Sequence, residues 1–203
     1  SMRSWREAAL QLEQENAHLL DLNKVKLNPK YNFISGKVLI DSGSNFRQSA
    51  IINLGNNDGI VEGWATMDGL GLVGRITGVG SETSRVLFLT DTSSNIPVLI
   101  KPSNQRAILS GDNSLQPALL FIENTQQIQP GDRVVTSGDG GVFPSDLLIG
   151  QVSLNNSNQF QTQLAANLYN LSFLRVIRHS PTAPIKQPNR LIGPILPKVS
   201  NDG

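Results

Sequence analysis

The residues best spaced for chemistry are three glycines and an aspartate in the stretch from Gly69 to Asp91, G-L-G-L-V-G-R-I-T-G-V-G-S-E-T-S-R-V-L-F-L-T-D. Gly69, Gly71 and Gly74 have the G-x-G-x-x-G spacing of a dinucleotide-binding loop, in which the last glycine opens a helix that holds a pyrophosphate. Here the last glycine opens R-I-T-G-V-G, which is a poor first helical turn. We therefore expect no dinucleotide cofactor, and interpret Gly71, Gly74 and Gly78 as architectural positions in a kinked strand.

A second glycine-rich loop, S-G-D-G-G-V-F-P at residues 137–144, resembles the nucleophile loop G-D-S-G-G-P of chymotrypsin-type proteases. The serine of that loop is missing, because nothing stands between Asp139 and Gly140. A general base is missing too, since the two histidines, His18 and His179, lie outside the strand-rich part of the chain. We therefore expect no catalytic triad and no enzyme activity.

Turn geometry accounts for the glycines of this loop, and we assign Gly138 and Gly141 to it, together with Gly59 in the turn N-N-D-G. Two alternatives stay open. One is a hydrolase with an unrecognised active site, built on the hydroxyl of Ser137 or Ser145. The other is a β-barrel that binds a small ligand, for which an aromatic content of 5% offers few stacking surfaces.

The numbers of histidine, cysteine and charged residues argue against two further classes of function, metal binding and nucleic-acid binding. The 203 residues include two histidines and no cysteine, so we expect no metal site built from Cys and His. The 17 basic and 16 acidic residues give a net charge of +1 without a basic block along the sequence, which argues against a nucleic-acid partner.

Residues 4–27 form the only strongly helical segment of the sequence, which Asn28-Pro29 ends. Its seam positions have the heptad spacing of a short coiled coil: Trp5, Ala9, Leu12, Asn16 and Leu19. Because asparagine at a seam position specifies pairing and register, we expect residues 1–28 to be a coiled-coil helix that drives self-association. The alternative is an amphipathic helix that packs on its own domain.

From about residue 31 to residue 178 the pattern is extended. Short apolar or alternating segments are bounded by Gly, Asn, Asp, Ser or Pro, with no helix between them. We expect the run V-L-F-L at residues 86–89 to be a strand with both faces covered. The regular spacing of the segments predicts a mainly β protein, built as antiparallel barrels or sandwiches.

The two ends of the sequence differ from this body. Five of the 11 prolines fall between Pro181 and Pro197, so we expect residues 180–203 to be an extended Pro-rich tail. No apolar run reaches the 18 or so residues of a membrane span. The chain begins with Ser1-Met2, which indicates a trimmed N-terminus, and we expect a membrane anchor to precede it in the full-length protein.

Five motifs follow the helical segment in a fixed order: I-N-L-G-N-N-D-G-I-V-E-G-W, D-G-L-G-L-V-G-R-I, T-S-R-V-L-F-L-T-D, R-A-I-L-S-G and G-D-R-V-V-T-S-G-D-G-G-V-F-P-S-D-L-L-I-G-Q-V. Each motif is only a turn signature, but the order resembles the family of rod shape-determining protein MreC over about residues 5–178. Asn56-Asn57 and Trp64 vary the first motif, and the tail lies outside the resemblance.

The resemblance implies a periplasmic or extracytoplasmic protein, tethered to the cytoplasmic membrane, with a coiled coil followed by two small antiparallel β-barrels. The second barrel would be inserted into the first, with the first at 30–66 plus 146–179 and the second at 67–145. The family implies a non-catalytic scaffold of the cell-elongation machinery. It would self-associate as a dimer or filament and bind a peptidoglycan transpeptidase and MreB/MreD-type proteins. We expect the partner contact to use exposed strand edges or an apolar barrel face.

Overall fold

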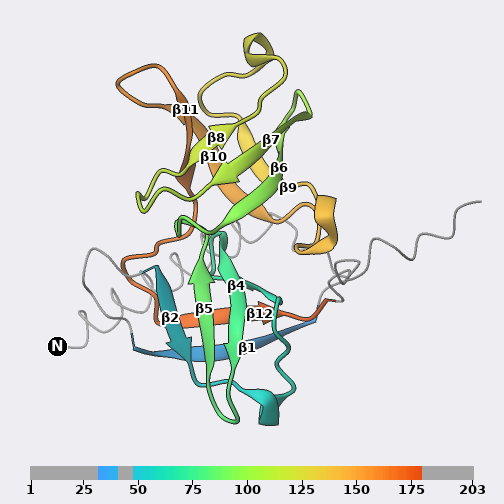
Figure 1. Ribbon diagram of the computed structural model, residues 1–203, viewed down its shortest axis with the longest axis vertical. Coiled ribbons are helices and arrows are strands. Elements are labelled where there is room, and N and C mark those ends of the chain that lie inside the picture. Colours follow the sequence, from blue (N-terminus) through green and yellow to red (C-terminus); the bar gives the residue numbers. More distant parts are fainter. Residues whose placement is uncertain (1–31, 41–47, 180–203) are drawn as a thin grey trace, which may run out of the picture.

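The computed structural model describes residues 32–40 and 48–179, so the helix expected at 1–28 and the tail expected at 180–203 lie outside its described part. In that part, twelve strands and three short 3-10 helices form two closed antiparallel barrels of six strands each (Figure 1). The prediction of a mainly β body with two antiparallel barrels is confirmed. Among the described residues, no helix is long and apolar enough to cross a membrane.

The first barrel, in the lower half of Figure 1, has the strand order β1-β12-β3-β4-β5-β2. Its strands are β1 (Phe33–Ile40), β2 (Ser49–Ile52), β3 (Ala65–Met67), β4 (Leu72–Val79), β5 (Ser84–Phe88) and β12 (Phe173–Ile177). The 3-10 helix η1 (Asn56–Asp58) lies between β2 and β3. The strand predicted around Gly74 and Gly78 is confirmed as β4, and the strand predicted in the run at residues 86–89 is confirmed as β5.

The second barrel, in the upper half of Figure 1, has the strand order β10-β11-β8-β7-β6-β9. Its strands are β6 (Asn95–Lys101), β7 (Gln105–Ser110), β8 (Ala118–Leu120), β9 (Arg133–Thr136), β10 (Leu148–Leu154) and β11 (Phe160–Leu164). Two 3-10 helices, η2 (Thr125–Gln127) and η3 (Asp139–Gly141), precede and follow β9.

The second barrel is inserted into the first between β5 and β12, but the strands divide differently from the ranges 30–66 plus 146–179 and 67–145. β4 and β5 pair with β3 and β2, and therefore belong to the first barrel. β10 and β11 pair with β9 and β8, and therefore belong to the second. The predicted ranges missed this because turn signals mark where strands end, whereas barrel membership depends on pairing between strands far apart in the sequence.

Buried and more exposed residues alternate along β5, which contradicts the expectation that both of its faces are covered. Val86 and Phe88 are buried, whereas Arg85 is exposed and Leu87 is half-buried. The expectation that both faces of this strand are covered is therefore wrong, because its outer face borders solvent. Leu89, the last residue of the V-L-F-L run, lies beyond the end of β5 and is fully buried in a different cluster of side chains.

Two clusters of buried side chains form the core. The first fills the first barrel, and its buried members come from β2, β4, β5, β12 and the segments beside them: Ala50, Ile52, Leu54, Ile60, Trp64, Val73, Ile76, Val86, Phe88, Ala166, Leu168, Leu171, Leu174 and Val176. The second fills the second barrel with aliphatic side chains such as Ile96, Ile100, Leu109 and Ile149. It also includes Ala65, Met67, Leu72, Leu89 and Ile177 from the first barrel or its edge, so apolar contact is continuous across the junction.

Candidate partner-binding surface

The protease-like loop is a turn built on left-handed glycines. Gly138, Gly140 and Gly141 have φ angles of 81°, 74° and 67°, in the region that glycine adopts without strain. The hydroxyl of Ser137 accepts a hydrogen bond from the backbone N–H of Asp139 at 3.1 Å, which closes the turn locally. The chemistry of this loop is therefore that of a backbone turn.

His179 is the one histidine in the described part, and it belongs to the first barrel rather than to this loop. Its Nε2 accepts a hydrogen bond from the backbone N–H of Ala65 at 3.1 Å. Burial lowers the pKa of His179 below 6.5, which favours the neutral imidazole that this acceptor role requires. The described residues therefore bring no histidine to Ser137 or Ser145, and they contain no group of three or more potential metal ligands.

The glycines expected to be architectural occupy three kinds of position. Gly59 caps η1 with φ 77°. Gly74 lies inside β4 where a Cβ would overlap the carbonyl oxygen of Leu87 in β5. A Cβ on Gly71 would lie 3.0 Å from the Cβ of Ala165, at the junction with the second barrel. At Gly78 a Cβ would make only ordinary contact, 3.9 Å from Arg85 Cβ, so close approach does not explain that glycine.

Both barrels are closed, so the sheets of the described part present no free edge strand. The expectation of partner pairing through exposed strand edges is therefore wrong for this part of the chain, because each strand has a neighbour on both sides. The residues expected to mediate self-association, from Trp5 to Leu19, lie outside the described residues. The surface left for a partner is the outer face of a barrel.

The outer side of β1 and β12 carries several exposed apolar side chains of the first barrel. In this antiparallel pair Phe33 lies opposite Ile177, and Lys37 lies opposite Phe173. Every second residue turns inward: Ile34 and Val38 of β1 and Leu174 and Val176 of β12 pack in the core of the barrel. The residues between them therefore point outward on one shared surface.

We call this surface the β1–β12 face and define it by Phe33, Lys37, Leu39, Phe173 and Arg175. Phe33, Leu39 and Phe173 expose 49%, 50% and 64% of their surface. The Arg175 guanidinium lies over the Phe33 ring, 5.2 Å from its centroid, in a cation–π contact. Neither β1 nor β12 contains an acidic residue, so the face combines aromatic, aliphatic and basic side chains.

One end of the β1–β12 face continues into the junction between the barrels. Met67 lies opposite Arg175 across β3 and β12, and it is buried in the cluster that fills the second barrel. Tyr169, which is 70% exposed, lies in the segment that leads into β12. Aromatic residues and arginine are the types that protein–protein interfaces enrich, and an exposed group of them indicates a binding surface.

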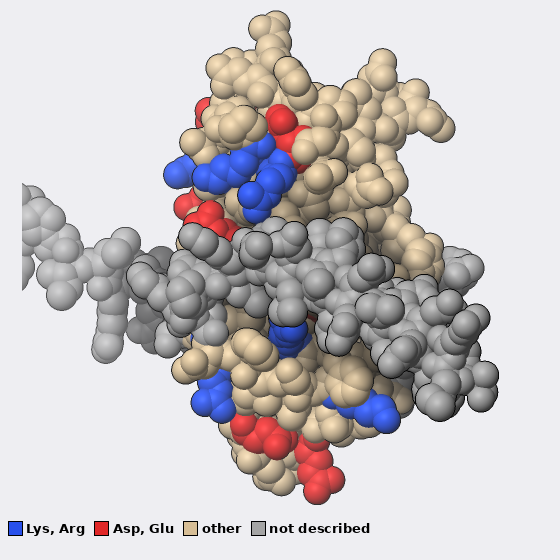
Figure 2. Space-filling view, turned by 180° about the vertical axis from the view of Figure 1, so that it is seen from behind, with Lys and Arg blue, Asp and Glu red and all other residues tan. Residues whose placement is uncertain are grey.

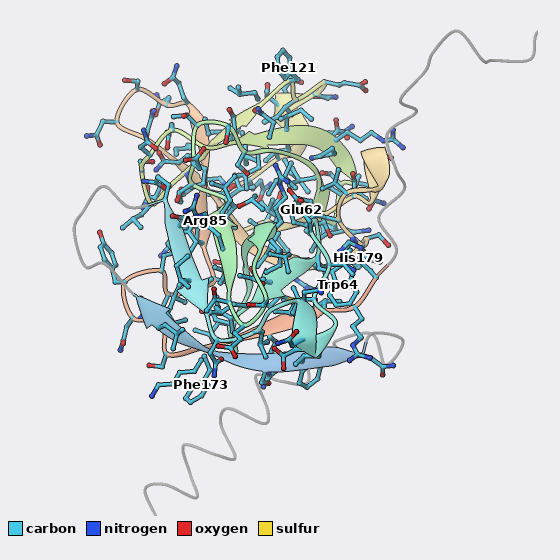
Figure 3. The ribbon with its side chains drawn as sticks, turned by 60° about the horizontal axis from the view of Figure 1, so that its bottom comes forward. Glu62, Trp64, Arg85, Phe121, Phe173 and His179 are labelled. Carbon is cyan, nitrogen blue, oxygen red and sulfur yellow. The ribbon has the colours of Figure 1, made fainter. Side chains whose placement is uncertain are left out.

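A single exposed aromatic on the second barrel offers a comparison. Phe121 follows β8, is 82% exposed and has a φ angle of 58°. Figure 3 shows Phe121 and Phe173 at opposite ends of the view, on different barrels. The exposed apolar neighbour of Phe121 is Leu120, the residue before it in the sequence. Phe173, in contrast, belongs to a surface that two paired strands build together.

The sequence contained a signal for the β1–β12 face that motif analysis passed over. In F-I-S-G-K-V-L-I the residues at alternate positions are Phe, Ser, Lys and Leu, so the strand face opposite Ile34 and Val38 carries two large apolar side chains. The sequence could not show that Phe173 lies on the same face, because β1 and β12 stand at opposite ends of the β region in the sequence and only their pairing brings Phe173 opposite Lys37.

The sequence of this chain is similar to those of known proteins of one family. The family model described as "Rod shape-determining protein MreC, barrel core" matches residues 38–178. The cell shape-determining protein MreC of Cereibacter sphaeroides is 59% identical over 191 residues, which cover 94% of this chain and 64% of that protein. The chain thus spans somewhat less than two thirds of the length of this relative.

Solved structures agree with the fold. A crystal structure of MreC from Pseudomonas aeruginosa has a TM-score of 0.65 and 28% identity, covering 71% of this chain and 98% of that one. MreC of Helicobacter pylori, in a structure described as a complex with penicillin-binding protein PBP2, has a TM-score of 0.53 and 16% identity. That match covers 74% of this chain and 100% of the other, and at this identity it shows the fold alone. With a family model that covers most of its length and two barrels of the same architecture, the chain belongs to the MreC family of cell shape-determining proteins.

Proposed function

We propose that this chain is the extracytoplasmic part of a non-catalytic scaffold of the rod-shape machinery, and that it binds a peptidoglycan transpeptidase through the β1–β12 face. The observation that carries the proposal is the exposed pair of Phe33 and Phe173 on two adjacent strands, with Arg175 stacked on Phe33. Exposing an aromatic side chain to water is unfavourable, and a partner that covers the side chain lowers the free energy of the system.

Three further observations support a binding role over catalysis or ligand storage. The hydroxyl of Ser137 accepts a hydrogen bond from the backbone N–H of Asp139, and His179, the histidine of the described part, bonds to Ala65 instead. Both barrel interiors are filled by buried side chains, as six-stranded barrels are too narrow to hold a ligand. The H. pylori relative is described in a complex with penicillin-binding protein PBP2, and we propose a partner of that kind for this chain.

Self-association and membrane tethering belong to the same proposal. The seam residues Trp5, Leu12 and Asn16 would pair two copies of residues 1–28 and leave the barrels free to bind. A segment before Ser1 would anchor the protein to the cytoplasmic membrane, beside MreB/MreD-type partners. This arrangement would hold the transpeptidase at the outer surface of that membrane, where peptidoglycan precursors are incorporated into the cell wall.

The proposal is tested by titrating the purified extracytoplasmic transpeptidase of the same organism into this protein and measuring the heat of binding. We expect saturable binding that changes little between low ionic strength and about 0.15 M salt, since the contact is mainly apolar. Absence of binding by protein shown to be folded would contradict the scaffold role. A steep fall of affinity with salt would contradict the apolar contact and leave the scaffold role in place.

A further inference from the structure

All the basic residues of the second barrel lie on one side of it. Between residues 95 and 164 the sequence has three basic residues, Lys101 in β6, Arg106 in β7 and Arg133 in β9. These three strands are neighbours in the order β7-β6-β9. Figure 2 shows the blue atoms of the upper barrel gathered in one patch, with red atoms above it and below it to the left.

The strand register places two of these charges against each other. Lys101 and Arg133 are direct partners across β6 and β9. Their inward neighbours Ile100 and Val134 are fully buried, so both cationic side chains point outward. Like charges that face each other across a strand pair destabilise a sheet. Arg106 lies opposite Leu99, two residues from Lys101, and extends the group onto the third strand.

The acidic residues near these charges lie beside the three strands and not on them. β6, β7 and β9 contain no acidic residue. Asp139 Oδ2 lies 3.6 Å from Arg106 Nη1, but both side chains are substantially exposed, and such pairs contribute little. Asp132 accepts a hydrogen bond from the backbone N–H of Gln129 at 2.9 Å, and within the described residues it forms no ion pair with its neighbour Arg133. Lys101 donates to the side-chain oxygen of Asn104 at 2.8 Å, which is neutral.

The shape and composition of this surface indicate the kind of ligand. The outer face of a closed barrel is convex and cannot enclose a single small anion. Half-buried Leu99 and Ile108 lie on the same side and offer apolar contact between the charges. The three strands have no aromatic residue on which a base or a sugar ring could stack, or which could anchor in a membrane interface. An extended partner with several carboxylates fits these features best.

We propose that the outer surface of β7, β6 and β9, which we call the basic face, binds an acidic segment of a protein partner through Lys101, Arg106 and Arg133. It lies on the other barrel from the β1–β12 face and does not depend on the transpeptidase contact. The scaffold would then have two binding faces of different chemistry, one mainly aromatic and insensitive to salt, the other cationic and sensitive to it.

The first test maps binding of a short poly-glutamate peptide to the isotope-labelled full chain by NMR. We expect shift changes confined to β6, β7 and β9 at low ionic strength, which fade as salt approaches about 0.15 M. Shift changes that instead map to the β1–β12 face, or no binding at low salt, would overturn the proposal. Vesicles of anionic phospholipid that perturb the basic face while the peptide does not would overturn the assignment of a protein partner.

The second test uses the double variant Lys101→Gln with Arg133→Gln, and as a matched control Arg75→Gln with Arg85→Gln on the first barrel. We expect the first variant to bind the peptide about tenfold more weakly and yet to melt at a higher temperature, because it removes cross-strand repulsion. The control, with the same loss of charge, should keep its affinity within about twofold. Equal losses in both variants would show a general charge effect and would contradict a specific basic face.

Discussion

Asp68 accepts a hydrogen bond from the backbone N–H of Asn167, with Oδ2 2.8 Å from the nitrogen. Its other oxygen, Oδ1, accepts from the backbone N–H groups of Leu70 and Gly71 at 2.7 and 2.8 Å. A single carboxylate therefore fixes the turn between β3 and β4 and ties it to the segment that returns the chain from the second barrel to the first. The junction depends on this carboxylate as well as on apolar contact.

Asp68→Ala should lower the free energy of unfolding by about 2–3 kcal/mol, because three backbone donors lose their acceptor. Urea denaturation of wild type and variant measures the difference. The matched control is Asp112→Ala, which removes a carboxylate that accepts from only one nearby N–H, that of Ser114. Equal losses of stability in the two variants would show that the bond to Asn167 contributes nothing of its own.

Two glycines of β4 should respond in opposite ways to the same change. Gly74→Ala should cost about 3 kcal/mol, because the new methyl group meets the backbone carbonyl of Leu87, which cannot move without disturbing β5. Gly78→Ala should leave stability unchanged or raise it by about 0.5 kcal/mol, because a Cβ there has room and the unfolded chain loses freedom. Thermal melts of the two variants decide this, and similar melting temperatures would contradict the close approach at Gly74.

His179 should make the stability of the first barrel depend on pH. Burial lowers its pKa in the folded state below the ordinary value of 6.5, so the unfolded chain binds the proton more readily. The contribution of neutral His179 is fully present above pH 6.5 and is lost as the pH falls through the folded-state pKa. His179→Gln keeps an acceptor for the Ala65 N–H and cannot titrate. Its free energy of unfolding should therefore fall less than that of wild type between pH about 7 and about 5, and equal falls in the two proteins would contradict this role.

Removal of residues 1–28 should leave the two barrels folded and reduce the association of the protein. Both core clusters draw members from the whole described part of the chain, between residues 34 and 177, so the barrels have an apolar core of their own. Sedimentation should show a smaller assembly, and a thermal melt should stay cooperative. If the shortened protein instead lost its cooperative transition, the helix would belong to the core of the barrels.

The sequence predicted those features that depend on local chemistry. β4 and β5 follow from alternation and turn residues, and Gly74 was interpreted as an architectural position. The Leu87 carbonyl that requires a glycine there belongs to the neighbouring strand. β3, with only Ala65–Met67, was missed because three residues are too few to show alternation. Strand pairing across the sequence was also beyond reach. The Lys101–Arg133 pair, the Phe33–Phe173 surface and the true division into barrels all depend on register between distant segments.

The central claim, that the β1–β12 face holds the transpeptidase, is tested most directly by calorimetric titration of two matched variants. Phe33→Ser with Phe173→Ser removes both exposed rings of that face, and Phe121→Ser removes the exposed ring of the second barrel. We expect the first variant to bind the extracytoplasmic transpeptidase about thirtyfold more weakly than wild type, a loss typical of an aromatic hot spot, and Phe121→Ser to bind within about twofold of it. Loss of affinity in Phe121→Ser with none in the double variant would contradict the claim and move the contact to the second barrel.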